Sequence, residues 1–124
     1  MPFGNSKLQA FLIVGPYVLS CEAIFLRKRR YFVKLKDRVV GTLVFHEKSD
    51  ALYIRSLAVA PEFRRLGVAT YILNLVERSA TRIGKKSIEL SVLKSNFPAR
   101  RLYRKFGFAQ KEEKKRSFVL AKRV

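Results

Sequence analysis

With 124 residues and 48% hydrophobic side chains, the chain is long enough for one domain with a single core, and this composition excludes a disordered protein. The formal net charge of +18 comes from 27 Lys and Arg against 9 Asp and Glu, so we expect anionic partners such as nucleic acid, an anionic cofactor or an acidic protein. The single cysteine, Cys21, excludes an internal disulfide and has no neighbouring ligand for a metal site, which predicts a cytoplasmic protein without a metal.

The first thirty residues allow two interpretations. The stretch from Leu8 to Leu26 is mostly apolar and follows Lys7, which resembles a signal peptide or a lipoprotein signal. Gly15-Pro16 and Glu22 interrupt it, and a membrane-spanning helix needs about 20 apolar residues with few or no charges. We therefore favour a short buried strand at 8–14 and a helix from Pro16 to about Arg29, because proline suits the first turn of a helix.

The next segments predict a meander of three strands. They are expected at Tyr31–Lys36, Val39–Glu47 and Ala51–Val59, with charged or polar turns at 36–38 and 48–50. In the first of them Tyr31 and Val33 alternate with Phe32 and Lys34, which places the two pairs on opposite faces.

A long amphipathic helix is predicted from about Arg64 to Ile83. Apolar residues recur there at alternating steps of three and four, and Gly84 stands at the expected stop. The remaining elements are expected in the order of a strand at Ser87–Leu93, a helix at Phe97–Phe106 that ends at Gly107, and a hairpin with arms at Phe108–Lys111 and Ser117–Ala121. The fold class is therefore α/β (α+β), a mixed and mostly antiparallel sheet with helices on both faces, in which the strands flanking the long helix are parallel neighbours.

The start of the long helix predicts an anion site. The first N–H groups of a helix lack internal partners, and the helix dipole adds positive potential there. Gly67 and Ala69 would let a phosphate approach the backbone, and Arg64 and Arg65 are well placed only if an anion lies beside them. No P-loop and no G-x-G-x-x-G occurs. Taken alone, a glycine in the first turn of a helix with basic neighbours is more often explained by packing than by ligand binding.

Two motifs together resemble the GNAT superfamily of N-acetyltransferases. The stretch "LAVAPEFRRLGVAT" resembles the acetyl-CoA signature V-x-P-x-x-[RQ]-x-x-G-x-[GA] of that family, and "SVLKSNFPARRLYRKFGF" resembles its downstream N-x-x-A-x-x-L-Y-x-x-x-G-F. The matching positions are Val59, Pro61, Arg64, Gly67 and Ala69 in the first motif, and Asn96, Ala99, Leu102, Tyr103, Gly107 and Phe108 in the second. The resemblance covers about residues 31–124 and implies a single domain over 1–124, with an N-terminal part (1–30) shorter than the family's usual strand and two helices.

The resemblance implies the acyl-CoA N-acyltransferase fold, in which the two parallel strands splay apart in a V. The pantetheine arm of acetyl-CoA would pair with the backbone of one strand as an extra strand does, and the pyrophosphate would lie on the N–H groups at the start of the long helix. The residues expected to bind acetyl-CoA are Leu57, Ala58, Val59, Arg64, Arg65, Leu66, Gly67, Val68, Ala69, Thr70 and Asn96.

The same resemblance implies that Tyr103 acts as the general acid toward the departing thiolate; in isolation, a tyrosine in this helix is more often part of the core. The family often places a glutamate five residues before the asparagine, but Ser91 stands there in this chain. Glu89 is a tentative base acting through water, with an ordinary strand carboxylate as the alternative. His46, the only histidine, is expected to be a surface or core side chain.

These features predict an enzyme that transfers an acetyl group from acetyl-CoA to a primary amine (a protein N-terminus, a lysine or a small amine) by direct attack in a ternary complex. The charge favours acceptors in acidic surroundings, and we expect a monomer or a homodimer away from the membrane. The alternative is a basic, non-catalytic module that binds nucleic acid or the ribosome, although no nucleic-acid-binding motif occurs in the sequence.

Overall fold

The structure, a computed structural model, describes the backbone of residues 7–14, 17–25, 30–35 and 38–124, and the side chains of residues 30–34 and 38–124. These ranges contain strands β1 (Lys7–Val14), β2 (Tyr17–Phe25), β3 (Arg30–Leu35), β4 (Arg38–Glu47), β5 (Ala51–Val59), β6 (Ser87–Leu93), β7 (Ala109–Glu113) and β8 (Ser117–Arg123). They also contain a single 3-10 turn, η1 (Pro61–Phe63), and the helices α1 (Val68–Arg82) and α2 (Phe97–Phe106).

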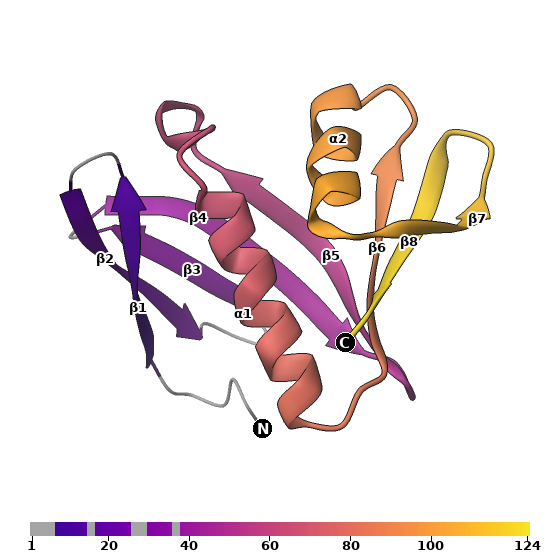
Figure 1. The fold of residues 1–124 in the computed structure, drawn as a ribbon, viewed down its shortest axis with the longest axis horizontal. Helices are drawn as coiled ribbons and strands as arrows, with labels where there is room; N and C mark the ends of the chain where they lie inside the picture. Colours follow the sequence, from indigo (N-terminus) through magenta and orange to yellow (C-terminus); the bar gives the residue numbers. More distant parts are fainter. Residues whose placement is uncertain (1–6, 15–16, 26–29, 36–37) are drawn as a thin grey trace.

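The strands form one sheet in the order β1-β2-β3-β4-β5-β6-β8-β7 (Figure 1). All neighbours are antiparallel except β5 and β6, which flank α1 and run parallel. The mixed, mostly antiparallel sheet predicted from the sequence is therefore confirmed, together with its parallel pair.

The predicted helix from Pro16 to Arg29 is wrong, because Tyr17–Phe25 forms strand β2. Its backbone pairs with β1 from Val14↔Tyr17 to Lys7↔Ile24, and with β3 on its other side. The segment YVLSCEAIF is rich in β-branched and aromatic residues, which favour a strand between two neighbours over a helix. Residues 26–29 of that prediction lie outside the described ranges. In the described part of the chain, no helix is long and apolar enough to cross a membrane.

Both described helices lie on the same face of the sheet (Figure 1), so the expectation of helices on both faces is also corrected. Lys122 of β8 shows this arrangement, since its ammonium group pairs with Glu77 of α1 and lies 5.0 Å from the ring centroid of Phe106 of α2. One core cluster fills the space between sheet and helices, with Leu43, Ile72 and Leu90 at most 2% exposed. Gly41 of β4 allows close packing there, since a Cβ at this position would stand 3.2 Å from Ile72 Cδ1.

The parallel strands separate after only four residue pairs. Ala51–Ile54 of β5 pair with Ser87–Leu90 of β6, and beyond these residues the two strands diverge toward the start of α1 and of α2 (Figure 1). A β-bulge in β5 gives a physical cause. Val44 pairs with Ser56 and Phe45 with Ile54, so Arg55 is an extra residue directly after the last parallel pair. Because bulges bend and twist a strand, β5 turns away from β6 at this point.

Candidate active site

The first helical turn of α1 begins later than the sequence predicted, at Val68 rather than near Arg64. Gly67 is the N-cap, with a left-handed φ of 84°, and the first helical hydrogen bond runs from Tyr71 N–H to Gly67 O (2.9 Å). Arg65 has a φ of 64° and is the one non-glycine residue with positive φ in the described ranges. Such a conformation costs an L-residue roughly 1–2 kcal/mol, so the loop is held in a strained shape.

This loop leaves a row of backbone donors without protein acceptors. Among the described residues, the N–H groups from Arg65 to Thr70 form no hydrogen bond. No side chain caps α1, and its first turn contains no acidic residue. In many helices a side chain accepts hydrogen bonds from these N–H groups. In α1 the N–H groups and the positive end of the helix dipole can instead bind an external anion. The residues therefore fit a pyrophosphate, and binding at this helix end stays a prediction.

The two arginines before α1 differ in what they do. Arg64 Nε donates to the carbonyl of Val59 at the end of β5 (3.2 Å), which ties the loop to the strand. Arg65 is exposed and pairs with no carboxylate of the described part of the chain. Arg64 thus fixes the geometry of the loop, while the Arg65 guanidinium is available to an anion.

The three residues expected to bind the pantetheine arm lie where β5 has left β6. Leu57 and Val59 pack against the core, and Ala58 is exposed. On one side all three pair with β4, through Leu43, Thr42 and Gly41. On the other side, their backbone lies beyond the last pair with β6, so it can accept an extended ligand as an added strand.

Asn96 stands across the opening, between β6 and α2. It is the N-cap of α2, and its side-chain oxygen accepts a hydrogen bond from Ala99 N–H (3.2 Å). Capping uses the oxygen and leaves the amide nitrogen as a donor. The structural role and the expected contact with the pantetheine arm are therefore compatible.

Tyr103 lies on the face of α2 that packs toward the sheet. Its side chain is 8% exposed, and its ring meets Phe108 edge-on with the centroids 5.7 Å apart. Burial raises the pKa of the phenol above its ordinary value of 10.0. The group is therefore protonated at neutral pH and is suited to donate a proton rather than to accept one.

Glu89 is buried and paired, whereas a base that acts through water needs a carboxylate oxygen free to accept a proton. It is 5% exposed, and its two oxygens pair with Lys111 Nζ (2.8 Å) and Lys48 Nζ (3.4 Å). Burial alone would raise its pKa, but hydrogen bonds and charge from the two lysines outweigh burial and lower it. A carboxylate held in this way is a weak proton acceptor, so the structure favours a structural ion cluster. The described residues also contain no group of three or more potential metal ligands.

The sequence did not reveal a hydroxyl pair at the point where the V opens. Tyr53 Oη and Ser91 Oγ are 2.5 Å apart, and they come from β5 and β6 on either side of the opening. His46 of β4 stacks on the Tyr53 ring (5.2 Å between centroids). Tyr53 lies between the core residues Leu52 and Ile54, so its side chain points to the sheet face opposite the helices. Only the register of β5 against β6 brings the two hydroxyls together, and a single sequence does not specify that register.

The model of the acetyltransferase (GNAT) family matches residues 9–108 of the chain. Over 115 residues the chain is 42% identical to the mouse cysteine-rich protein 2-binding protein, covering 90% of this chain and 14% of that protein. It is 32% identical over 78 residues to an uncharacterized N-acetyltransferase of Methanocaldococcus jannaschii, covering 63% of this chain and 34% of that protein. The chain thus spans about a third or less of the length of these relatives.

Solved structures share the fold at low identity. The GNAT domain of S. lividans PAT superposes with a TM-score of 0.77 at 10% identity, covering 94% of this chain and 97% of that one. The PaiA N-acetyltransferase of Thermoplasma acidophilum, solved in complex with coenzyme A, gives a TM-score of 0.73 at 17% identity over 77% and 60% of the two chains. The family match spans most of the chain, and both motifs lie around the opened β5–β6 pair, so this protein belongs to the GNAT family of acetyltransferases.

Proposed function

We propose that this chain transfers the acetyl group of acetyl-CoA to a primary amine. One observation carries the proposal: the β5–β6 pairing ends after four residue pairs, and the part of β5 beyond it leads to the unpaired N–H groups at the start of α1. The first feature suits an extended amide-containing arm and the second a pyrophosphate, and acetyl-CoA joins the two in one molecule.

Acetyl-CoA supplies a thioester, whose carbonyl carbon the amine attacks and from which the thiolate departs. The backbone from Leu57 to Val59 and the amide of Asn96 hold the arm, while Arg65 and the N–H groups from Arg65 to Thr70 hold the diphosphate. Tyr103, which is protonated at neutral pH, donates its proton to the departing sulfur to give the CoA thiol and regains a proton from solvent; this general-acid step contributes roughly 10²–10⁴-fold.

The acceptor amine needs a group that orients it and receives its hydrogen bond. We assign this role to the hydroxyl pair of Tyr53 and Ser91, which lies at the apex of the V on the sheet face opposite the helices. Ser91 is exposed, so a proton leaving the amine reaches bulk water through this pair. Glu89, already occupied by two lysines, takes no part.

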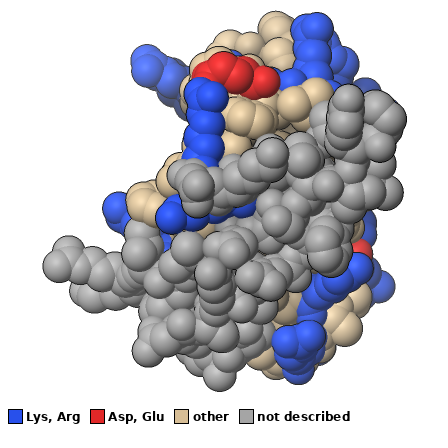
Figure 2. All heavy atoms as spheres, turned by 90° about the vertical axis from the view of Figure 1, so that its left-hand side faces the viewer, with Lys and Arg blue, Asp and Glu red and all other residues tan. Residues whose placement is uncertain are grey.

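The proposed acceptors are amines in acidic surroundings. Lys and Arg side chains occupy several parts of the molecular edge in Figure 2, whereas Asp and Glu are confined to small areas of that view. With a formal charge of +18, the protein repels polyamines and lysine-rich tails and attracts acidic polypeptides.

The decisive experiment measures amine-dependent release of the CoA thiol from acetyl-CoA over a panel of peptides and small amines, next to thermal melting. Acetyl-CoA at about 100 times its dissociation constant is expected to stabilise the protein by roughly 2.7 kcal/mol. An unchanged melting temperature together with tight, salt-sensitive RNA binding would support the non-catalytic nucleic-acid-binding module instead.

A further inference from the structure

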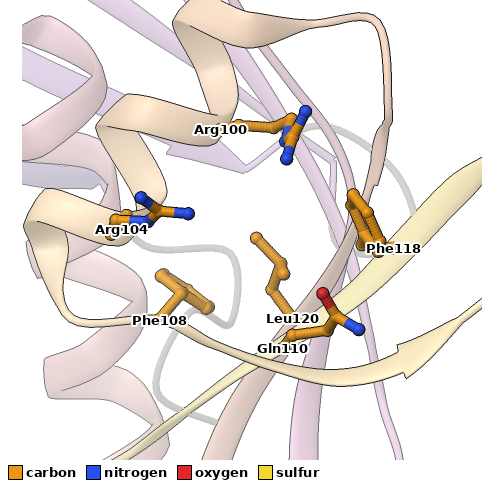
Figure 3. A pocket seen from close by; sticks show the side chains of 6 residues that line it. All are labelled: Arg100, Arg104, Phe108, Gln110, Phe118 and Leu120. Atoms are coloured by element: carbon orange, nitrogen blue, oxygen red, sulfur yellow. The ribbon is translucent and has the colours of Figure 1, made fainter.

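A second place where basic side chains gather lies between α2 and the β7–β8 hairpin. A cavity of about 70 Å³ opens there, lined by Arg100, Arg104, Phe108, Gln110, Phe118 and Leu120 (Figure 3). A water molecule needs roughly 10–15 Å³ of such space, so the cavity has room for a group of several heavy atoms.

The two arginines carry charge that no carboxylate of the described residues neutralises. They stand one helical turn apart on α2, and both guanidinium groups point toward the hairpin side chains (Figure 3). Arg100 is held in place, since it donates to Lys94 O (2.8 Å) and stacks on the rings of Phe97 and Phe118 at 5.2 and 5.0 Å. Arg104 is exposed and forms no ion pair within the described part of the chain.

The opposite wall of the cavity is apolar. Phe108, Phe118 and Leu120 form it, with the Gln110 amide at the side (Figure 3). A phosphate presents oxygen in every direction and would lose water on this wall without replacement. An aspartate or glutamate side chain matches this wall better. Its methylene groups can contact the rings, while its carboxylate accepts hydrogen bonds from the two guanidinium groups.

We propose that this cavity binds an acidic side chain of an acidic polypeptide. Phe108 lies between the cavity and Tyr103, whose ring it contacts edge-on, so the bound segment docks on the helix face of the sheet with one ring between it and Tyr103. That this polypeptide also carries the acetyl acceptor rests on the proposed function, whereas the binding itself requires no acetyl transfer.

The test uses a tetraglutamate peptide with acetylated N-terminus and amidated C-terminus, which cannot serve as an acceptor, titrated by calorimetry into the protein at low salt. Arg104→Gln is expected to weaken binding at least about fivefold, since it removes a charge-assisted contact. Arg101→Gln is the matched control: it removes the same charge from an exposed position of α2 that does not line the cavity, and binding changes less than about twofold.

Four outcomes would overturn the proposal. Equal weakening by both variants would mean diffuse attraction to a basic surface. A carboxylate site would be excluded if tetraglutamine bound as tightly as tetraglutamate. It would also be excluded if inorganic phosphate or a short RNA displaced the peptide at a lower concentration than the peptide itself requires. A rise in the acetyl-CoA dissociation constant in Arg104→Gln alone would place the cavity in the cofactor site. Since none of these measurements uses turnover, their failure is distinct from failure of the proposed acetyl transfer.

Discussion

At the scale of single residues, removing the hydroxyl of Tyr103 tests its role in the chemical step separately from acetyl-CoA binding. Tyr103→Phe keeps the ring that contacts Phe108, so the fold is retained, and removes only the proton donor. We expect the turnover number to fall by roughly 10²-fold or more while the acetyl-CoA dissociation constant changes less than about twofold. Steady-state kinetics with calorimetric titration measure the two effects. Unchanged turnover would show that the phenol only fills the core.

Glu89 predicts a pH dependence of stability. Its pKa in the folded protein is lowered from 4.5, so its ion pairs stabilise the fold fully above that pH and are lost as the pH falls through the folded value. Glu89→Gln is therefore expected to reduce the free energy of unfolding by about 1–3 kcal/mol at neutral pH and by progressively less in acid. Denaturant titrations at a series of pH values measure this difference.

Glu113→Gln is the control for that series, because Glu113 also pairs with a lysine, Lys94, but is 58% exposed at its side chain. An exposed pair contributes at most about 1 kcal/mol, so this variant should stay close to the unchanged protein at every pH. If Glu89→Gln behaved in the same way, the buried cluster would not be a stabilising element.

At the scale of elements, Gly67 connects the loop conformation to ligand binding. Gly67→Ala introduces a methyl group at a left-handed position and at the edge of the predicted anion site. Gly84→Ala is a matched control, because Gly84 also has positive φ, lies beyond the other end of α1, and has open space around a Cβ. Both variants are expected to lose about 1 kcal/mol of stability, but only Gly67→Ala should weaken acetyl-CoA binding, by about tenfold. Equal affinities in the two variants would argue against a diphosphate at this helix end.

Elements with strong periodicity were predictable from the sequence, and the N-terminal hairpin was not. The apolar stripe of α1 and the alternation of Tyr31 and Val33 against Phe32 and Lys34 each have one physical interpretation, and the burial pattern confirms both. Tyr17–Phe25 carries two opposed signals, since a preceding proline favours the start of a helix whereas the β-propensity of the segment favours a strand. Pairing on both sides, with β1 and with β3, decides its conformation, and those partners are distant in sequence.

The residues of the candidate site also fall into a part that the sequence predicts and a part that it does not. The motifs identify residues that lie close together along the chain, such as Arg64 and Gly67 or Asn96 and Tyr103. Contacts that depend on register between strands were inaccessible, which is why Tyr53 and Ser91 were missed and why the two lysines on Glu89 were not foreseen.

At the scale of the whole molecule, charge predicts acceptor preference. Long-range attraction acts mainly on the rate of encounter, and salt screens it over about 10 Å at 0.1 M. At low salt we therefore expect turnover of acidic peptides to exceed that of basic peptides of equal length, by about tenfold or more, and the ratio to shrink as salt is added. Measuring kcat/KM for both series at several salt concentrations checks this. Faster turnover of basic peptides would contradict the predicted preference.

The short ladder between β5 and β6 has a mechanical consequence. Four residue pairs are the direct backbone joint between a half-sheet of β1–β5 and a half-sheet of β6–β8, with α1 packed across both. Such a joint acts as a hinge whose angle is set by whatever fills the wedge. A ligand that forms hydrogen bonds along the second half of β5 and binds at the start of α1 would fix the angle between the two half-sheets. Amide hydrogen exchange from Arg55 to Val59 would then slow far more than exchange within β4.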